Sequence, residues 1–145
     1  MKNKITLLLL IGVSLLSAQQ KSTGVVTLST NMAATLTLDN GTSTATLSLT
    51  GPNDRWFALQ FGSFTGGMAA GSDLVYWDNV TLVDARHVGI GSTPTTDATN
   101  NWTITSNLNN SPSVGLRTIV ATRAFNTGDA NDFAFNFSDT SIDFA

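Results

Sequence analysis

The segment "ATLTLDNGTSTATLSLT", residues 34–50, constrains the fold more than any other part of the chain. Leucines alternate with threonine or serine in both halves, so each half has one apolar and one polar face, as in a half-buried β-strand. Asp39-Asn40-Gly41 separates the halves, and Asn and Gly accept the positive φ angles of tight hairpin turns. The segment therefore predicts a β-hairpin that packs one face on a core.

Similar short runs, separated by turn signals, recur along the chain at the spacing typical of β-sandwiches. The chain has no Glu and no amphipathic helical pattern, while Thr and Val, which favour strands, are frequent. We expect an all-β protein, an antiparallel β-sandwich of about eight or nine strands. The further runs are 55–62, expected to be a central strand, two runs around Asp78-Asn79, and the runs 114–125 and 133–137.

The first eighteen residues have the pattern of a secretory signal peptide. Lys2 and Lys4 precede an apolar run over residues 5–16, and the small residues Ser17 and Ala18 follow. We predict a signal peptide at 1–18, one β-sandwich domain at 19–145, and a secreted, cell-surface or periplasmic location. Removing the two lysines leaves five basic against ten acidic residues, a formal charge of −5 that disfavours nucleic-acid partners. No second apolar run is long enough for a membrane span.

Few residue types suited to catalysis are present. The chain has no Cys, a single His at position 87 and no Gly-x-Ser-x-Gly motif. We therefore expect no enzymatic activity. His87 follows Asp84 on a strand or its exit and is expected at the surface or half-buried.

Two pairs of aspartates have spacings that need an interpretation: Asp129 with Asp132, and Asp139 with Asp143. The first three lie in turn-like segments, where Asp commonly accepts hydrogen bonds from nearby backbone. Asp143 alternates with Ile142 and Phe144 and is expected on the outer face of a strand. Structural roles are the main interpretation, and a calcium site is the alternative.

Met68 stands alone in the glycine-rich loop "GGMAAGSD". A methionine there could close the end of the core, because its flexible side chain fills irregular gaps. Its thioether could instead face a ligand, since flanking glycines allow the backbone to approach a flat molecule closely. The sequence leaves both interpretations open.

The order of several segments resembles the DOMON family. These are "DRWFALQFG", the glycine-flanked Met68, "SDLVYW", "VTLVDARHVG", Pro94 with Asp97, and "TIVATRAFNTGDANDFAF". The resemblance covers residues 35–145. It implies a β-sandwich and an extracytoplasmic module that binds haem b or a sugar.

In the haem-binding branch of that family, a loop methionine and a later histidine are the axial ligands of the iron. Met68 matches the methionine, so the resemblance implies haem b as cofactor, Met68 as an iron ligand, and electron transfer with a redox partner protein. The matching histidine would lie beyond residue 145, and we therefore expect the sequence to be truncated at its C-terminus.

The alternative function is a carbohydrate-binding or adhesive surface module without redox activity. Exposed aromatic rings commonly form the platforms of sugar-binding surfaces. Trp56 and Trp77 lie in strand patterns and are expected in the core. Trp102, after the polar stretch "DATNN", is expected to be partly exposed and is the candidate sugar-binding residue.

Overall fold

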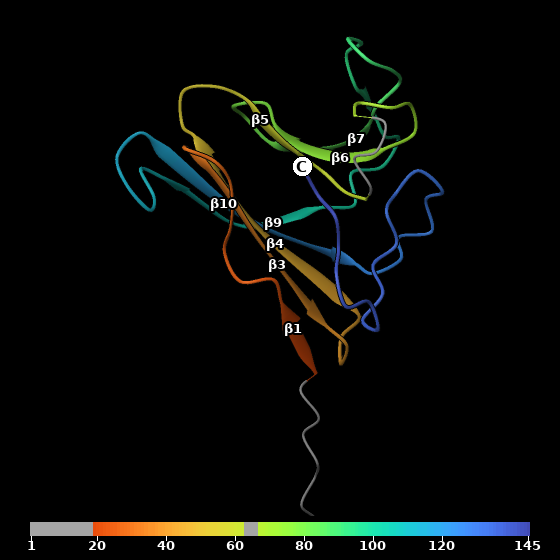
Figure 1. Cartoon of the computed structure of the whole chain (residues 1–145). Coiled ribbons are helices and arrows are strands. Elements are labelled where there is room, and N and C mark those ends of the chain that lie inside the picture. Colours follow the sequence, from red (N-terminus) through yellow and green to blue (C-terminus); the bar gives the residue numbers. More distant parts are fainter. Residues whose placement is uncertain (1–18, 63–66) are drawn as a thin grey trace, which may run out of the picture.

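A computed structural model describes residues 19–62 and 67–145, so the predicted signal peptide lies outside the described residues. The described chain forms ten strands in two antiparallel sheets, which confirms the predicted all-β fold (Figure 1). Two of the strands, β1 and β8, are only three and two residues long. Nothing in the described part of the chain is a helix of the length and apolarity needed to cross a membrane.

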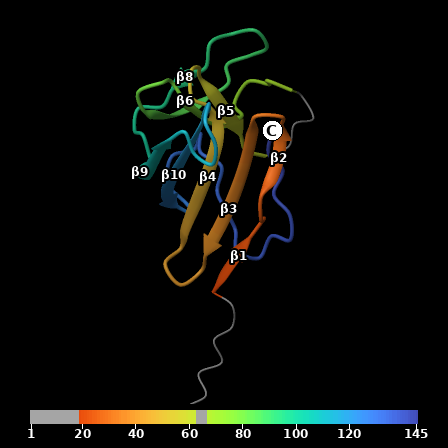
Figure 2. The same ribbon diagram turned by 90° about the vertical axis from the view of Figure 1, so that its left-hand side faces the viewer.

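The larger sheet has six strands in the order β1-β3-β4-β10-β9, with β2 also paired to β3 (Figure 2). Its centre is the predicted hairpin, in which Leu36 lies opposite Leu47. Asp39 Oδ1 closes the turn by accepting the N–H groups of Gly41 (2.8 Å) and Thr42 (3.1 Å). The strands are β1 (Gln20–Ser22), β2 (Val26–Ser29), β3 (Met32–Asp39), β4 (Thr44–Pro52), β9 (Thr103–Asn109) and β10 (Leu116–Ala124).

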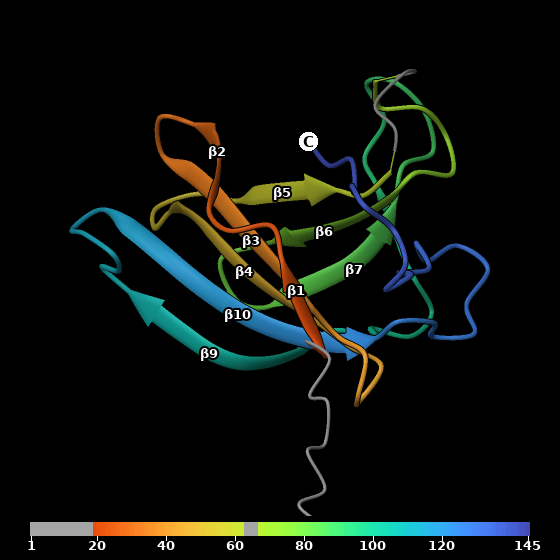
Figure 3. The same cartoon turned by 60° about the horizontal axis from the view of Figure 1, so that its bottom comes forward.

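The smaller sheet has four strands in the order β5-β6-β7-β8 and lies across the larger sheet as a second layer (Figures 1 and 3). The expectation of a central strand at 55–62 is wrong, because β5 is the first strand of this sheet. Beyond β5, among the described residues, there is a short contact with the end of the chain, where Gln60 N–H donates to the Ala145 carbonyl (2.7 Å). The strands are β5 (Phe57–Gln60), β6 (Asp73–Trp77), β7 (Leu82–Arg86) and β8 (Thr95–Thr96).

The alternating segment 133–137 does not form the predicted strand. Its backbone groups bond elsewhere: Phe133 N–H donates to Asp73 Oδ2 (2.7 Å), and Phe135 N–H donates to the Phe125 carbonyl (2.9 Å). The alternation nevertheless reflects burial, since Phe135 belongs to the core and its neighbours of like parity are partly buried. One side-chain bond and one backbone bond to the end of β10 take the place of strand pairing here.

The core lies between the sheets and is built from alternate residues of both. In the larger sheet the inward positions of β3 and β4 carry alanine and leucine, and those of the smaller sheet include the larger rings of Phe57 and Trp77. This size difference fills the space between two twisted layers. The core residues are Ala34, Leu36, Leu38, Ala45, Leu47, Leu49, Phe57, Leu59, Phe61, Val75, Trp77, Leu82, Trp102, Ile119, Ala121 and Phe135.

Gly51, near the end of β4, is required by the packing of Phe57. A Cβ atom at position 51 would lie 2.3 Å from Phe57 Cγ, which is far inside van der Waals contact.

We predict that Gly51→Ala lowers the free energy of unfolding by about 1–3 kcal/mol, the usual cost of an overpacked core. Urea denaturation measures this. Because alanine lacks the Cγ atom and the ring of Phe57, the same change should cost less in a Phe57→Ala background. An unchanged midpoint in the single variant would contradict the contact.

Candidate ligand-binding groove

A groove of about 800 Å³ lies on the face of the smaller sheet that points away from the core. Its floor follows from strand alternation, because Ala58 is paired with Tyr76 and Gln60 with Leu74. Cross-strand partners point to the same side of a sheet. The intervening residues of β5 and β6 point into the core instead. The volume is within the usual range of small-molecule sites, about 300–1,000 Å³.

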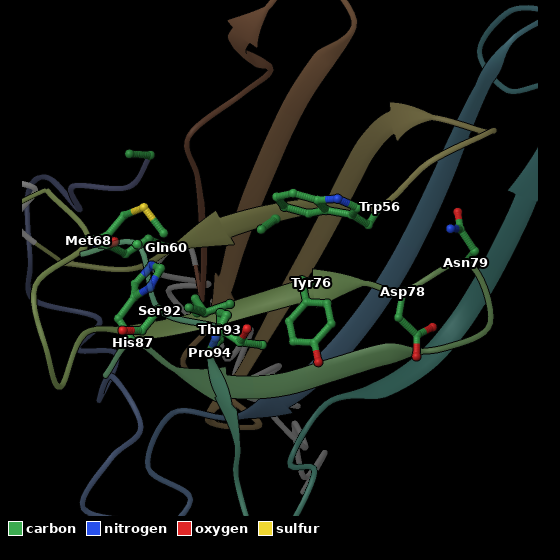
Figure 4. A pocket seen from close by; sticks show the side chains of 14 residues that line it. Trp56, Gln60, Met68, Tyr76, Asp78, Asn79, His87, Ser92, Thr93 and Pro94 are labelled. Atoms are coloured by element: carbon green, nitrogen blue, oxygen red, sulfur yellow. The ribbon is translucent and has the colours of Figure 1, made fainter. Parts of the chain in front are cut away.

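Different chemical groups gather at the two ends of the groove (Figure 4). Met68, Gln60 and His87 lie at one end, beside the loop that follows β7. Asp78 and Asn79 lie at the other end, at the turn between β6 and β7. Aromatic and apolar residues between the two ends give the groove a largely apolar lining. Besides the five end residues, the lining consists of Trp56, Ala58, Leu74, Tyr76, Gly91, Ser92, Thr93, Pro94 and Ala145.

Met68 lines the groove and is 39% exposed. The interpretation of Met68 as a residue that closes the end of the core is therefore wrong. The methionine lies at the edge of a groove whose volume suits a small-molecule ligand, on the opposite side of the smaller sheet from the core.

His87 lines the same groove and is only 8% exposed, so the expectation of a surface or half-buried histidine is wrong. Its backbone is fixed just beyond β7, where its N–H donates to the Ser72 carbonyl (2.9 Å) and its own carbonyl accepts from Gly71 (2.7 Å). Burial lowers the pKa of His87 below its usual 6.5, which keeps the imidazole neutral near pH 7. Within the described structure, Nδ1 is buried and has no hydrogen-bond partner.

Gln60 contributes a second unsatisfied polar group at that end. Its side chain is buried, and among the described residues neither its Oε1 nor its Nε2 has a hydrogen-bond partner. A buried amide without partners is costly, which favours a bound molecule that supplies them. No sequence pattern points to this residue, because a single Gln in an apolar strand looks like any outward-facing polar residue.

The three tryptophans are placed differently from the sequence expectations. Trp77 is in the core as predicted, with 2% of its surface exposed. Trp102 is 4% exposed and stacks on Phe61 with ring centroids 5.8 Å apart, so the expected exposure of Trp102 is wrong. Trp56, expected in the core, is 68% exposed and borders the groove. Trp56 immediately precedes β5, and the alternation of that strand places its side chain on the outer face. The polar residues before Trp102 do not determine which way its side chain points.

Behind the groove floor, Arg123 is buried between the sheets. Its guanidinium carbon lies 4.8 Å from the ring centroids of both Trp102 and Phe135. Nη2 donates to Asp73 Oδ2 at 3.0 Å, joining β10 of the larger sheet to β6 of the smaller one. Asp84 on β7 and Asp132 in the loop after β10 lie further from Nη1, at 3.9 and 3.8 Å.

The aspartates of both predicted pairs have defined positions. Asp129 accepts the N–H of Asn131 (2.9 Å), as expected for an Asp in a turn. The side chain of Asp132 is buried beside Arg123, a placement that the turn pattern did not indicate. Asp139 and Asp143 are exposed, as an outer-face position predicts for Asp143.

Comparison with known proteins adds no family assignment. No protein-family model matches the chain, and no curated protein sequence is significantly similar to it.

The carboxyl of Asp84 makes stability depend on pH. Burial raises the pKa of Asp84 to about 7, and the nearby Asp132 and Asp73 carboxylates add to the effect, while the Asn101 N–H and Arg123 oppose it. Burial also raises the pKa of Asp73. Between about pH 4 and 7 the folded state therefore holds a proton that the unfolded state has lost. Stability from this source is greatest in acid and is lost as the pH rises through 7.

We predict that the melting temperature in EDTA falls between about pH 5 and pH 8, because folding must then bury an ionised Asp84. The Asp84→Asn variant, which cannot ionise there, should show a smaller fall. Asp139→Asn, at an exposed position, serves as the control and should keep the wild-type profile. Differential scanning calorimetry measures all three. A wild-type melting temperature that rises over this range would contradict the prediction.

Proposed function

We propose that this chain is an exported, DOMON-like ligand-binding module that holds haem b in the groove and transfers electrons. The observation that carries the proposal is the convergence of Met68 and His87 on one groove of suitable volume. The two residues come from separate loops that meet beside the smaller sheet (Figure 4). A methionine and a neutral histidine are an axial ligand pair used by haem proteins.

The chemistry of the groove suits a haem group. The lowered pKa of His87 leaves its ring nitrogens available to a metal, and the buried Nδ1 without a partner fits a second interaction there. The Met68 thioether is a soft ligand that favours ferrous iron and raises the reduction potential. Bound haem would supply one-electron transfer to a redox partner protein.

The remaining groove residues have roles that follow from their positions. Tyr76 and Leu74 present an apolar floor, and a low-polarity surround also tunes the reduction potential. Gln60 offers both a donor and an acceptor at the Met68 end, where it can hold a polar group of the ligand or orient an axial ligand.

We predict that the protein, produced with its full chain, binds haemin and shows a low-spin spectrum on reduction with dithionite. Met68→Leu keeps side-chain volume and should cost less than about 1.5 kcal/mol of stability, yet it should abolish the low-spin spectrum and lower the reduction potential. His87→Phe should also abolish that spectrum. Val88→Ala, at a neighbouring exposed position, is the control and should leave it unchanged.

The outcomes separate the ligands. Loss in Met68→Leu alone would show that the second axial ligand is not His87, and would favour the histidine that the family resemblance implies beyond residue 145. No haem uptake by the wild type would remove the proposal and favour the second function below.

The second candidate is carbohydrate binding, and the observation that favours it is the exposure of Trp56 on the groove. Its ring stands beside Tyr76, with Asp78 and Asn79 at the same end to accept and donate hydrogen bonds (Figure 4). Aromatic faces and nearby polar groups are the combination that amphipathic ring-shaped ligands need. Trp56 therefore takes the sugar-binding role that the sequence analysis assigned to Trp102.

For this function we predict that a soluble polysaccharide retards the protein in affinity electrophoresis. Trp56→Ala should weaken the interaction about tenfold or more, equivalent to at least about 1.4 kcal/mol. Val80→Ala, at an exposed apolar position outside the groove, is the matched control. Retardation that survives Trp56→Ala would place the sugar site elsewhere, and no retardation by any tested polysaccharide would exclude this function for those ligands.

A further inference from the structure

Three buried carboxylates converge between the sheets, separated from the groove by the smaller sheet. Asp73, Asp84 and Asp132 each offer an oxygen atom, and these atoms all lie within 4.8 Å of one another. They come from β6, β7 and the loop after β10, so residues far apart in the sequence meet at one point.

Arg123 neutralises only part of this charge. Its one carboxylate hydrogen bond goes to Asp73, whereas its contacts with Asp84 and Asp132, at 3.9 and 3.8 Å, exceed hydrogen-bond length. When all three carboxylates are ionised, they and one guanidinium leave a formal excess of two negative charges. Buried charges are normally paired or coordinated to a metal, and a divalent cation would balance this excess.

A second observation is the set of oxygen atoms that lack partners. The Asp84 side chain is fully buried, yet Oδ1 accepts no hydrogen bond, and the same holds for Oδ1 of Asp73 and Asp132 within the described structure. Oδ2 of the buried Asp97 is likewise without a donor. A buried acceptor without a partner costs about 1–3 kcal/mol or more, so these atoms favour a bound ligand that satisfies them.

The side chain of Asn101 adjoins the carboxylates. The terminal amide of Asn101 lies 3.2 Å from Asp132 Oδ2 and 3.3 Å from the Thr99 carbonyl oxygen. Because both neighbours are acceptors, the amide nitrogen faces them and donates to both. Its backbone N–H donates to Asp84 Oδ2 (2.9 Å), which fixes the residue against the cluster.

We propose that Asp73, Asp84 and Asp132 bind a calcium-class divalent cation beside Arg123. The protein ligands are carboxylate oxygen atoms, which suit a hard cation and not zinc or copper. Calcium accepts six to eight oxygens in irregular geometry, including water. The ion joins β6 and β7 to the loop after β10, and so fastens the segment that carries Phe133 and Phe135 to the sandwich.

Two measurements on the full chain test the cation site. First, millimolar Ca²⁺ added to EDTA-treated protein should raise the melting temperature in a concentration-dependent manner, because the ion binds only the folded state. Second, Tb³⁺ should give saturable luminescence on excitation of tryptophan, since Trp102 lies against Arg123, and Ca²⁺ should displace it. A wild-type melting temperature that Ca²⁺ leaves unchanged overturns the proposal.

Single-residue variants locate the bound ion. Asp132→Asn should weaken Tb³⁺ and Ca²⁺ binding at least tenfold, whereas Asp139→Asn, exposed on the same C-terminal segment, should not. Trp102→Phe should lose the sensitised emission and keep the Ca²⁺ effect on melting. If Asp132→Asn fails to fold, Asp84→Asn replaces it, and the wild-type melting response remains decisive. Saturable emission that persists equally in the carboxylate variants would assign Tb³⁺ to surface aspartates and overturn the site.

Discussion

The buried guanidinium of Arg123 is the interaction on which the arrangement of the two sheets depends. It extends from the larger sheet, contacts the rings of Trp102 and Phe135, and bonds Asp73 of the smaller sheet. Removing one member of a buried pair typically costs about 3–5 kcal/mol, because the remaining charge is left without a partner. The contact therefore fixes the relative position of the sheets more specifically than apolar packing alone.

Arg123 also explains how a segment without strand pairing keeps a defined path. Its Nη2 donates to the carbonyl of Phe133, whose own N–H bonds Asp73. The backbone at Phe133 is thus anchored by charged side chains and not by a neighbouring strand. The phenylalanines of this segment reach the core because their backbone is held at these two points.

Period-two alternation made the fold class and the central hairpin predictable, since the leucines of residues 34–50 have one face to bury. The same alternation contains Arg123, which shares a face with Ile119 and Ala121, and Asp73, which shares one with Val75 and Trp77. The general tendency of charges to lie outside competes with that signal. Only the tertiary structure, which brings both charges to the same place, shows that they can be buried together.

Of the groove residues, the sequence could indicate Met68, because a lone methionine among glycines is unusual. His87 and Gln60 are ordinary residues at the ends of strands, and their shared surroundings depend on how β5, β6 and β7 pair.

Strands β5 and β6 each have a core face and a groove face, so selection for core packing and selection for ligand binding act on different positions. Positions 57, 59, 75 and 77 serve the core, and positions 58, 60, 74 and 76 line the groove. Substitutions at the second set can change what is bound while leaving the packing between the sheets intact. A lineage carrying this domain could therefore acquire new ligands one residue at a time, and a directed library confined to these four positions would explore specificity at little risk to folding.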